Sequence, residues 1–246
     1  MNALRTFFAI GILASSAAAQ NITGTITIDR KLTKPSVTAS IPIYQRGVVV
    51  KLGKDATPDP LAFERSRVVV FLEGAAASPA SAEHAGPFVM QQVNREFSPE
   101  VLVVPAGAAV NFPNMDPVFH NIFSLSKPKM FDLGSYDQGE SRRVVFPKPG
   151  VVSVYCHLHP NMAATIIVTP NRWYAKPDAS GNYKMENVPP GHYTVVAWHR
   201  ATGFLRKPVV VEAGHDLDVS FTLPLTEDQQ KPAGMQATPA RLAGSR

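Results

Sequence analysis

Four side chains in the middle of this chain have types and spacing suited to a soft metal ion. His120 opens an apolar segment, and Cys156, His159 and Met162 follow within one short stretch, Val154-Tyr-Cys-His-Leu-His-Pro-Asn-Met162. A strand that ends at Cys156 and continues into a tight loop can place a thiolate, an imidazole and a thioether close together at one end of a β-sandwich. Two imidazoles, one thiolate and a weak axial thioether form the ligand set of a blue-copper electron-transfer site.

The N-terminus predicts export. Arg5 precedes an apolar stretch from Phe7 to Ala14, and small residues follow up to Ala19. This order is typical of a secretory signal peptide, residues 1–19, and indicates cleavage after Ala19 and a periplasmic location. An uncleaved membrane anchor stays open as the alternative, although no later segment approaches the ~20 apolar residues of a spanning helix. We therefore expect no stable membrane insertion.

The single cysteine supports a ligand role. Exported proteins in an oxidising compartment usually pair their cysteines, but Cys156 has no partner within the chain. A bound metal would remove the thiol proton and protect the sulfur from oxidation. A buried, inert thiol is the alternative.

Other interpretations of the same residues stay open. His157 is a rival ligand, although as the next residue along the strand it should point away from Cys156. A structural zinc would accept one cysteine and two histidines but normally takes a fourth ligand other than a thioether. A Cys–His nucleophile would need an oxyanion site and a substrate pocket, and no feature of the sequence indicates either of them. A soft copper-delivery cluster could use Met90, Met115 and Met130.

Many short segments rich in Val, Ile, Phe and Thr, bounded by Pro and Gly, predict an all-β fold of sandwich type. The strands expected to position the four side chains are Ala109–Asn114, His120–Leu125, Val151–Cys156 and Ala164–Val168. Ala75–Gly86 reads as a linker, Pro170–Pro177 as a junction, and 225–246 as a disordered tail.

The order of these motifs resembles the cupredoxin (small blue copper protein) family. The resemblance covers residues 86–170, and the short Cys-x2-His-x2-Met loop is most similar to that of the amicyanins, within the plastocyanin-like proteins. It implies a Greek-key β-sandwich with one type 1 copper. His120, Cys156 and His159 would be its equatorial ligands, and Met162 would be its axial ligand.

The same resemblance implies electron transport between redox proteins. The ring edge of His159 would be the electron port, surrounded by an apolar docking patch of Leu158, Pro160 and Met162. Asn121 would brace the two ligand loops by hydrogen bonds. The expected partners are a periplasmic c-type cytochrome or a dehydrogenase. A copper chaperone or storage module is the alternative function.

A second resemblance concerns the C-terminal region. Asp178–Trp198 is similar to the carboxypeptidase regulatory-like, transthyretin-like β-sandwich, which implies a second sandwich at 171–224. Such modules usually start with a Gly-x-Ile-x-Ile strand, and that pattern occurs at Gly24–Ile28. We therefore hypothesise that residues 21–74 form the first half of this sandwich, with the copper domain inserted. A tandem arrangement stays open, as does an adhesion or carbohydrate-binding role with vestigial copper ligands.

Charge and histidine content exclude further functions. The net charge is +5, and the basic residues are scattered without interleaved aromatics, so nucleic acid is not an expected partner. Multicopper enzymes need additional histidine pairs. The remaining histidines, which are His84, His192, His199 and His215, are isolated. We therefore expect electron transfer without substrate turnover, and no enzyme activity.

Overall fold

The computed structural model describes residues 20–32, 59–74 and 87–224. The predicted leader, the predicted linker and the predicted tail lie outside the described residues. The described part is almost entirely β and forms two sandwiches, so the predicted all-β fold is confirmed. Its one helix, α1 (Pro60–Arg65), is far too short to cross a membrane.

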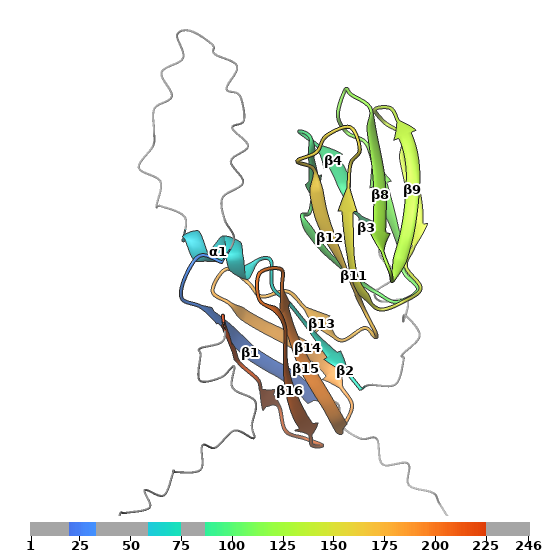
Figure 1. Cartoon of the computed structure of the whole chain (residues 1–246). Coiled ribbons are helices and arrows are strands. Elements are labelled where there is room, and N and C mark those ends of the chain that lie inside the picture. The colour runs from blue at the N-terminus through green and yellow to red at the C-terminus, as the bar shows by residue number, and fades with distance from the viewer. Residues whose placement is uncertain (1–19, 33–58, 75–86, 225–246) are drawn as a thin grey trace, which may run out of the picture.

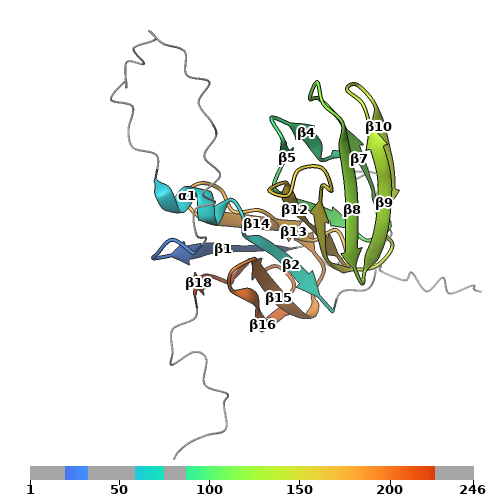
Figure 2. The same ribbon diagram turned by 45° about the horizontal axis from the view of Figure 1, so that its top comes forward.

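The first body, called here the central sandwich, comprises two sheets and a hairpin. The sheets have the strand orders β10-β7-β3 and β6-β12-β11-β8-β9, and β4 pairs with β5 beside them (Figures 1 and 2). The bounds are β3 (Phe88–Val89), β4 (Gln91–Val93), β5 (Glu96–Ser98), β6 (Val101–Pro105), β7 (Ala109–Pro113), β8 (His120–Ser126), β9 (Lys129–Tyr136), β10 (Ser141–Val145), β11 (Gly150–Tyr155) and β12 (Ala163–Thr169).

The second body, called here the terminal sandwich, is built from both ends of the described chain. One sheet has the order β14-β1-β17, with β18 also on β1, and the other has the order β13-β2-β15-β16. The bounds are β1 (Gln20–Ile28), β2 (Val69–Glu73), β13 (Tyr174–Ala175), β14 (Asn182–Val188), β15 (Gly191–His199), β16 (Gly203–Val211), β17 (Leu217–Asp218) and β18 (Phe221–Leu223).

Strands β1 and β2 precede the central sandwich in the chain but pair with strands that follow it. β1 pairs antiparallel with β14, and β2 pairs antiparallel with β13 and β15. This is the pairing that the insertion hypothesis requires, and a simple tandem would not produce it. The exact domain bounds stay predictions. Within the expected junction at Pro170–Pro177, Tyr174 and Ala175 form β13, which pairs with β2.

The two sandwiches share an apolar contact. Alternate residues of a strand point to opposite faces, so a strand covered on both sides is apolar throughout. In β2, Val70 and Leu72 face the core of the terminal sandwich, whereas Val69 and Phe71 face the central sandwich. They meet Ile167 of β12 and neighbours in β6, with Val151 of β11 packed against them.

This contact determines which end of the central sandwich is free. Val151 lies at the start of β11, opposite Ile167 of β12, and the loop that joins the two strands follows Tyr155 at the other end. At ~3.3 Å per residue, Cys156 lies about 16 Å along the chain from Val151. The loop therefore lies at the end of the central sandwich that points away from the terminal sandwich (Figure 1).

Candidate metal centre

The loop after β11 is closed by its own backbone. The N–H of Met162 donates to the carbonyl of His159 at 2.9 Å, and the N–H of Cys156 donates to the carbonyl of Met162 at 3.3 Å. These two bonds fold the seven residues into a compact turn between β11 and β12. The turn places the side chains of Cys156 and His159 on the same side of the loop.

His120 reaches the loop from a neighbouring strand. It is the first residue of β8, which pairs with β11 through Phe123 and Tyr155. The register of β8 against β9 shifts between Asn121 and Phe123, and His120, Asn121 and Ile122 are all buried. The sheet thereby brings together two residues that are 36 positions apart in sequence.

Three of the four predicted ligands converge. Cys156 Sγ lies 3.8 Å from His120 Nδ1 and 3.6 Å from His159 Nδ1. Among the residues that the structure describes, these three form the one group of at least three His, Cys, Asp or Glu side chains able to share a metal ion. The two imidazole rings have centroids 4.6 Å apart.

The separations fit a bound metal ion. Metal–nitrogen and metal–sulfur bonds of about 2.0 and 2.3 Å at a trigonal angle give a sulfur–nitrogen separation of about 3.7 Å. Both Sγ–Nδ1 distances lie within 0.1 Å of that value. The cysteine is 4% exposed and His120 is fully buried, while His159 is half-buried. A metal held here would be shielded from solvent except on the His159 side.

Met162 is placed differently from the other three. Its side chain is 1% exposed and belongs to the same core cluster as Cys156. Its axial role stays a prediction. Its expected part in an apolar docking patch was wrong, because a buried thioether offers a partner no surface.

The ionisation of the site favours metal binding. Burial lowers the pKa of His159, and the neighbouring His120 and Arg95 lower it further, against a smaller effect of Asp116. The imidazole is therefore neutral at pH 7, with a lone pair available for a metal.

His157, the rival ligand, faces away from the cysteine. Its ring stacks on Phe123 with centroids 3.7 Å apart and an interplanar angle of 2°. Its Nε2 lies 3.4 Å from Asp132 Oδ2. Asn121, which was expected to brace the ligand loops by hydrogen bonds, donates to Asp132 Oδ1 at 2.6 Å. Asn121 reaches the loop indirectly, through Asp132 and His157.

His157→Ala is expected to leave the visible and electron paramagnetic resonance spectra of the copper-loaded protein unchanged. The substitution removes a half-exposed ring stack, which costs roughly 0.5–1.5 kcal/mol of stability. A spectrophotometric titration with Cu(II), compared with wild type, measures this. A lost or strongly shifted spectrum would make His157 a ligand.

One group at the site was missed by the sequence reasoning. Asp116 Oδ2 lies 2.8 Å from His120 Nε2, on the side of the ring opposite to the cysteine. Asp116 stands four residues before His120, in the loop that leads into β8. The four-residue spacing between Asp116 and His120 is the sequence feature that could have indicated this contact. The contact itself depends on the path of the loop before β8, which the structure shows.

The three methionines of the alternative copper-delivery cluster are not gathered. Met90 is buried in the core, and Met130 pairs with Leu125, at the opposite end of the β8–β9 pair from His120. Met115 is exposed in the loop before β8.

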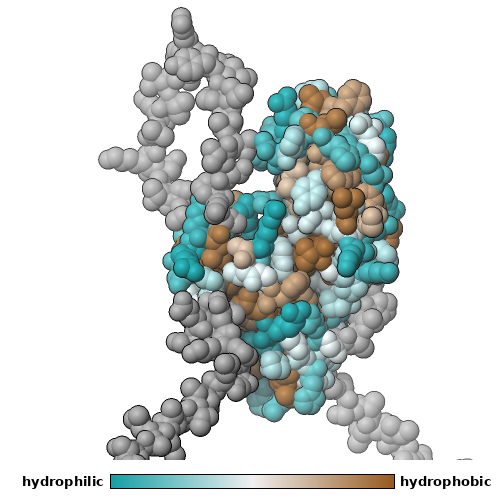
Figure 3. All heavy atoms as spheres, in the orientation of Figure 1, coloured by the Kyte–Doolittle hydropathy of each residue, from teal (hydrophilic) through white to brown (hydrophobic). Residues whose placement is uncertain are grey.

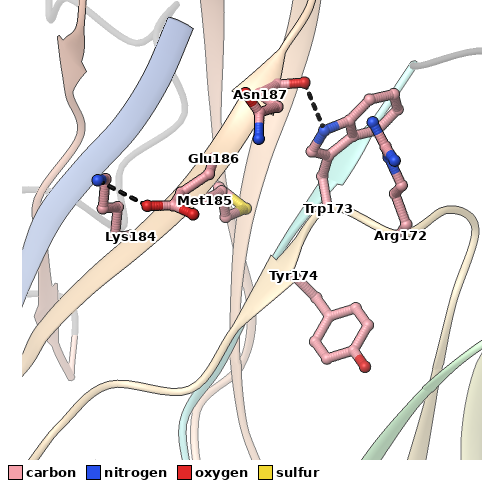
Figure 4. A pocket seen from close by; sticks show the side chains of 7 residues that line it. All are labelled: Arg172, Trp173, Tyr174, Lys184, Met185, Glu186 and Asn187. Carbon is pink, nitrogen blue, oxygen red and sulfur yellow. Dashed lines mark hydrogen bonds and ion pairs between the residues drawn. The ribbon is translucent and has the colours of Figure 1, made fainter. Parts of the chain in front are cut away.

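A hollow in the terminal sandwich offers no comparable chemistry (Figure 4). Its charged side chains engage one another, since Lys184 pairs with Glu186 at 2.7 Å. Trp173 donates to the carbonyl of Asn187 at 3.2 Å, and the Arg172 guanidinium lies over the indole ring. The lining residues are Arg172, Trp173, Tyr174, Lys184, Met185, Glu186 and Asn187.

No protein-family model matches the chain, and no curated protein matches it. Among solved structures, part of the chain is similar to copper proteins. A Cu-containing nitrite reductase (NirK) from Thermus scotoductus SA-01 is 31% identical over 33% of this chain, with a TM-score of 0.32. The match spans 22% of that reductase.

Two smaller proteins match over nearly their whole length. A purple cupredoxin from Nitrosopumilus maritimus is 27% identical, over 33% of this chain and 98% of its own, with a TM-score of 0.30. A reduced mutant of amicyanin is 17% identical, over 42% of this chain and 98% of its own, with a TM-score of 0.32.

Proposed function

We propose that this chain is an exported electron-transfer protein that holds one type 1 copper ion at His120, Cys156, His159 and Met162. The observation that carries the proposal is the convergence of Cys156 Sγ with the Nδ1 atoms of two histidines at 3.6 and 3.8 Å. A bound copper ion would supply a one-electron couple. The thiolate and the two imidazoles would hold it, and the buried thioether of Met162 would complete the set.

The rigidity of the site supports electron transfer. The ligand loop is closed by two backbone hydrogen bonds, and His120 is anchored in a sheet, so the three groups need little movement to serve either oxidation state. A small rearrangement on gaining or losing an electron favours fast transfer. His159 is the ligand nearest to solvent, and we assign its ring edge as the electron port.

The surface around His159 supports docking of a redox partner. Leu158 is 50% exposed and Phe119 is 56% exposed, and each is adjacent in sequence to a proposed ligand. Apolar side chains are visible at the same end of the central sandwich in Figure 3. An apolar patch without a dense charge suits brief contacts with a periplasmic c-type cytochrome or dehydrogenase.

The decisive experiment loads the mature protein with Cu(II) and records visible and electron paramagnetic resonance spectra. We expect one copper per chain, an intense thiolate-to-copper band, and reversible one-electron voltammetry. A colourless protein that binds only zinc would overturn the proposal. Rapid loss of Cu(I) to a competing chelator would favour the alternative, a chaperone or storage module.

Leu158→Glu is expected to slow electron self-exchange by on the order of tenfold or more, with an unchanged visible spectrum. Two copies must meet at their ports, and the substitution brings like charges together there. Paramagnetic line broadening of mixed Cu(I) and Cu(II) samples measures the rate. Leu125→Glu is the matched control, since Leu125 is 73% exposed at the far end of β8. Equal slowing by both variants would show that the electron port does not lie on the surface around Leu158.

Export is tested separately. We expect the secreted protein to begin at Gln20, and mass spectrometry of periplasmic extracts measures the mature N-terminus. Retention of residues 1–19 would favour the membrane-anchor alternative.

A further inference from the structure

A buried carboxylate stands behind one proposed ligand. Asp116 is 6% exposed, and its Oδ2 lies 2.8 Å from Nε2 of the fully buried His120. The other ring nitrogen, Nδ1, faces Cys156 Sγ at 3.8 Å. The imidazole therefore lies between a carboxylate on one side and the proposed metal position on the other.

A tight turn holds this carboxylate in place. β4 and β5 are joined by the two residues Asn94 and Arg95, whose φ angles are 56° and 57°. Positive φ at both central residues is the pattern of a two-residue hairpin turn of type I′. The turn directs two backbone N–H groups at Asp116: that of Asn94 donates to Oδ1 at 2.6 Å, and that of Arg95 donates to Oδ2 at 2.8 Å.

The loop that carries Asp116 is held from the other side. The backbone N–H of Asp116 donates to Asn114 Oδ1 at 2.9 Å. The amide nitrogen of Asn114 in turn donates to the carbonyls of Val118 and Tyr136 at 2.9 and 3.1 Å. These contacts hold the carboxylate of Asp116 in one orientation.

Both oxygens of the Asp116 carboxylate accept backbone N–H bonds, so this group acts toward the His120 ring as a hydrogen-bond acceptor. The hydrogen of this contact therefore lies on Nε2 of His120, and the tautomer that binds a metal has its Nδ1 lone pair free toward Cys156. A carboxylate behind a ligating histidine sets the tautomer, orients the ring and raises its basicity. The buried negative charge also lies close to the proposed metal, and it stabilises the more highly charged oxidation state.

We propose that Asp116 is a positioning residue that selects the Nδ1-ligating tautomer of His120 and that favours Cu(II) over Cu(I). The second part rests on the proposed function of the site. The first part concerns the metal-free protein and stands on the contact between Asp116 and His120.

The tautomer is tested on metal-free protein by long-range ¹H–¹⁵N correlation spectra of the His120 ring. We expect wild type to show the proton on Nε2, and Asp116→Asn to show a mixture of tautomers or exchange broadening. Glu140→Gln is the charge-matched control, since Glu140 is an exposed carboxylate of the same sandwich, paired with Arg142. A wild-type ring protonated on Nδ1 would overturn the proposal even if Asp116→Asn failed to fold.

The redox part is tested by voltammetry of the copper-loaded variants. Loss of a group behind a ligand typically lowers metal affinity 10–100-fold. We expect Asp116→Asn to weaken Cu(II) binding about tenfold relative to Cu(I), which raises a one-electron potential by about 59 mV. Glu140→Gln should leave the potential close to wild type. Equal shifts in the two variants would overturn this part of the proposal.

The two failures are distinguishable. If wild type binds no copper, the proposed function fails while the tautomer measurement can still be interpreted. If the copper spectrum is intact but neither the tautomer nor the potential responds to Asp116→Asn, only the role of Asp116 fails.

Discussion

Cys156→Ser protein is expected to lose the intense thiolate-to-copper band completely and to bind Cu(II) at least about 100-fold more weakly than wild type. Loss of an outer partner of a ligand already costs 10–100-fold in affinity, and here the sulfur ligand itself is removed. A serine hydroxyl stays protonated near neutral pH and replaces a soft ligand with a hard one. The measurement is a Cu(II) titration followed by absorbance and by electron paramagnetic resonance.

The folding of this variant needs its own measurement. Cys156 is buried in the core of the central sandwich, so burying a hydroxyl there costs about 1–3 kcal/mol. Thermal unfolding of the metal-free protein separates that cost from the loss of copper. His157→Ala is the matched control, because it changes the next residue in the same loop without touching the cysteine. An intact band in Cys156→Ser, with a folded protein, would exclude the thiolate as the ligand.

Gly24→Val is expected to destabilise the terminal sandwich by about 3 kcal/mol or more, near or above the top of the usual range for overpacking. A Cβ at this position of β1 would lie 2.3 Å from the carbonyl oxygen of Val219 and 2.9 Å from the Tyr183 ring. The backbone of Val219 cannot easily yield, because its N–H donates to the carbonyl of Thr23 at 2.8 Å and its carbonyl accepts from the Tyr183 hydroxyl.

Urea unfolding of metal-free Gly24→Val measures this effect. Thr27→Ala is the matched control, since Thr27 is an exposed residue of the same strand. We expect the control to stay within about 0.5 kcal/mol of wild type. An equally small effect for Gly24→Val would contradict the close approach of β1 to Val219, and with it the placement of this N-terminal strand in the terminal sandwich.

The physical contact between the sandwiches explains a feature of the sequence that is ambiguous on its own. The run Val68-Val-Val-Phe-Leu72 has no polar–apolar alternation. Alternation would be expected for a strand of a two-layer sandwich whose outer face meets solvent. In the structure, alternate side chains of the run enter two different apolar clusters. The burial of both faces of β2 therefore explains why this run is continuously apolar.

One strand of the central sandwich could not be read from the sequence. β9, Lys129–Tyr136, is an edge strand whose side chains are mostly half-buried or exposed, and it contains Gly134. The preceding Lys127-Pro128 resembles a turn. An edge strand that buries few of its side chains shows only a weak apolar pattern. The position of β9 is set by its backbone pairing with β8. β9 nevertheless matters to the site, since it supplies Asp132, the partner of Asn121 and His157.

The local part of the site could be predicted from residue type and spacing. Cys156, His159 and Met162 lie within seven residues, so a single closed turn decides their proximity, and residue type and spacing are enough to predict it. Short segments rich in Val, Ile, Phe and Thr, bounded by Pro and Gly, likewise predicted the β character of the chain. The resemblance of Asp178–Trp198 to a transthyretin-like sandwich, together with the Gly-x-Ile-x-Ile pattern at Gly24–Ile28, predicted that this segment pairs with the C-terminal region.

Contacts between residues far apart in the chain follow from the tertiary structure and could not be predicted from the sequence. The distance from His120 to Cys156 depends on the pairing of β8 with β11, and the stacking of His157 on Phe123 depends on the same pairing. The carboxylate partner of His120 depends on the hairpin turn at Asn94 and Arg95, whose N–H groups hold Asp116 in place. Such contacts follow from strand register and loop path, which hydrophobic pattern leaves open because it specifies faces but not neighbours.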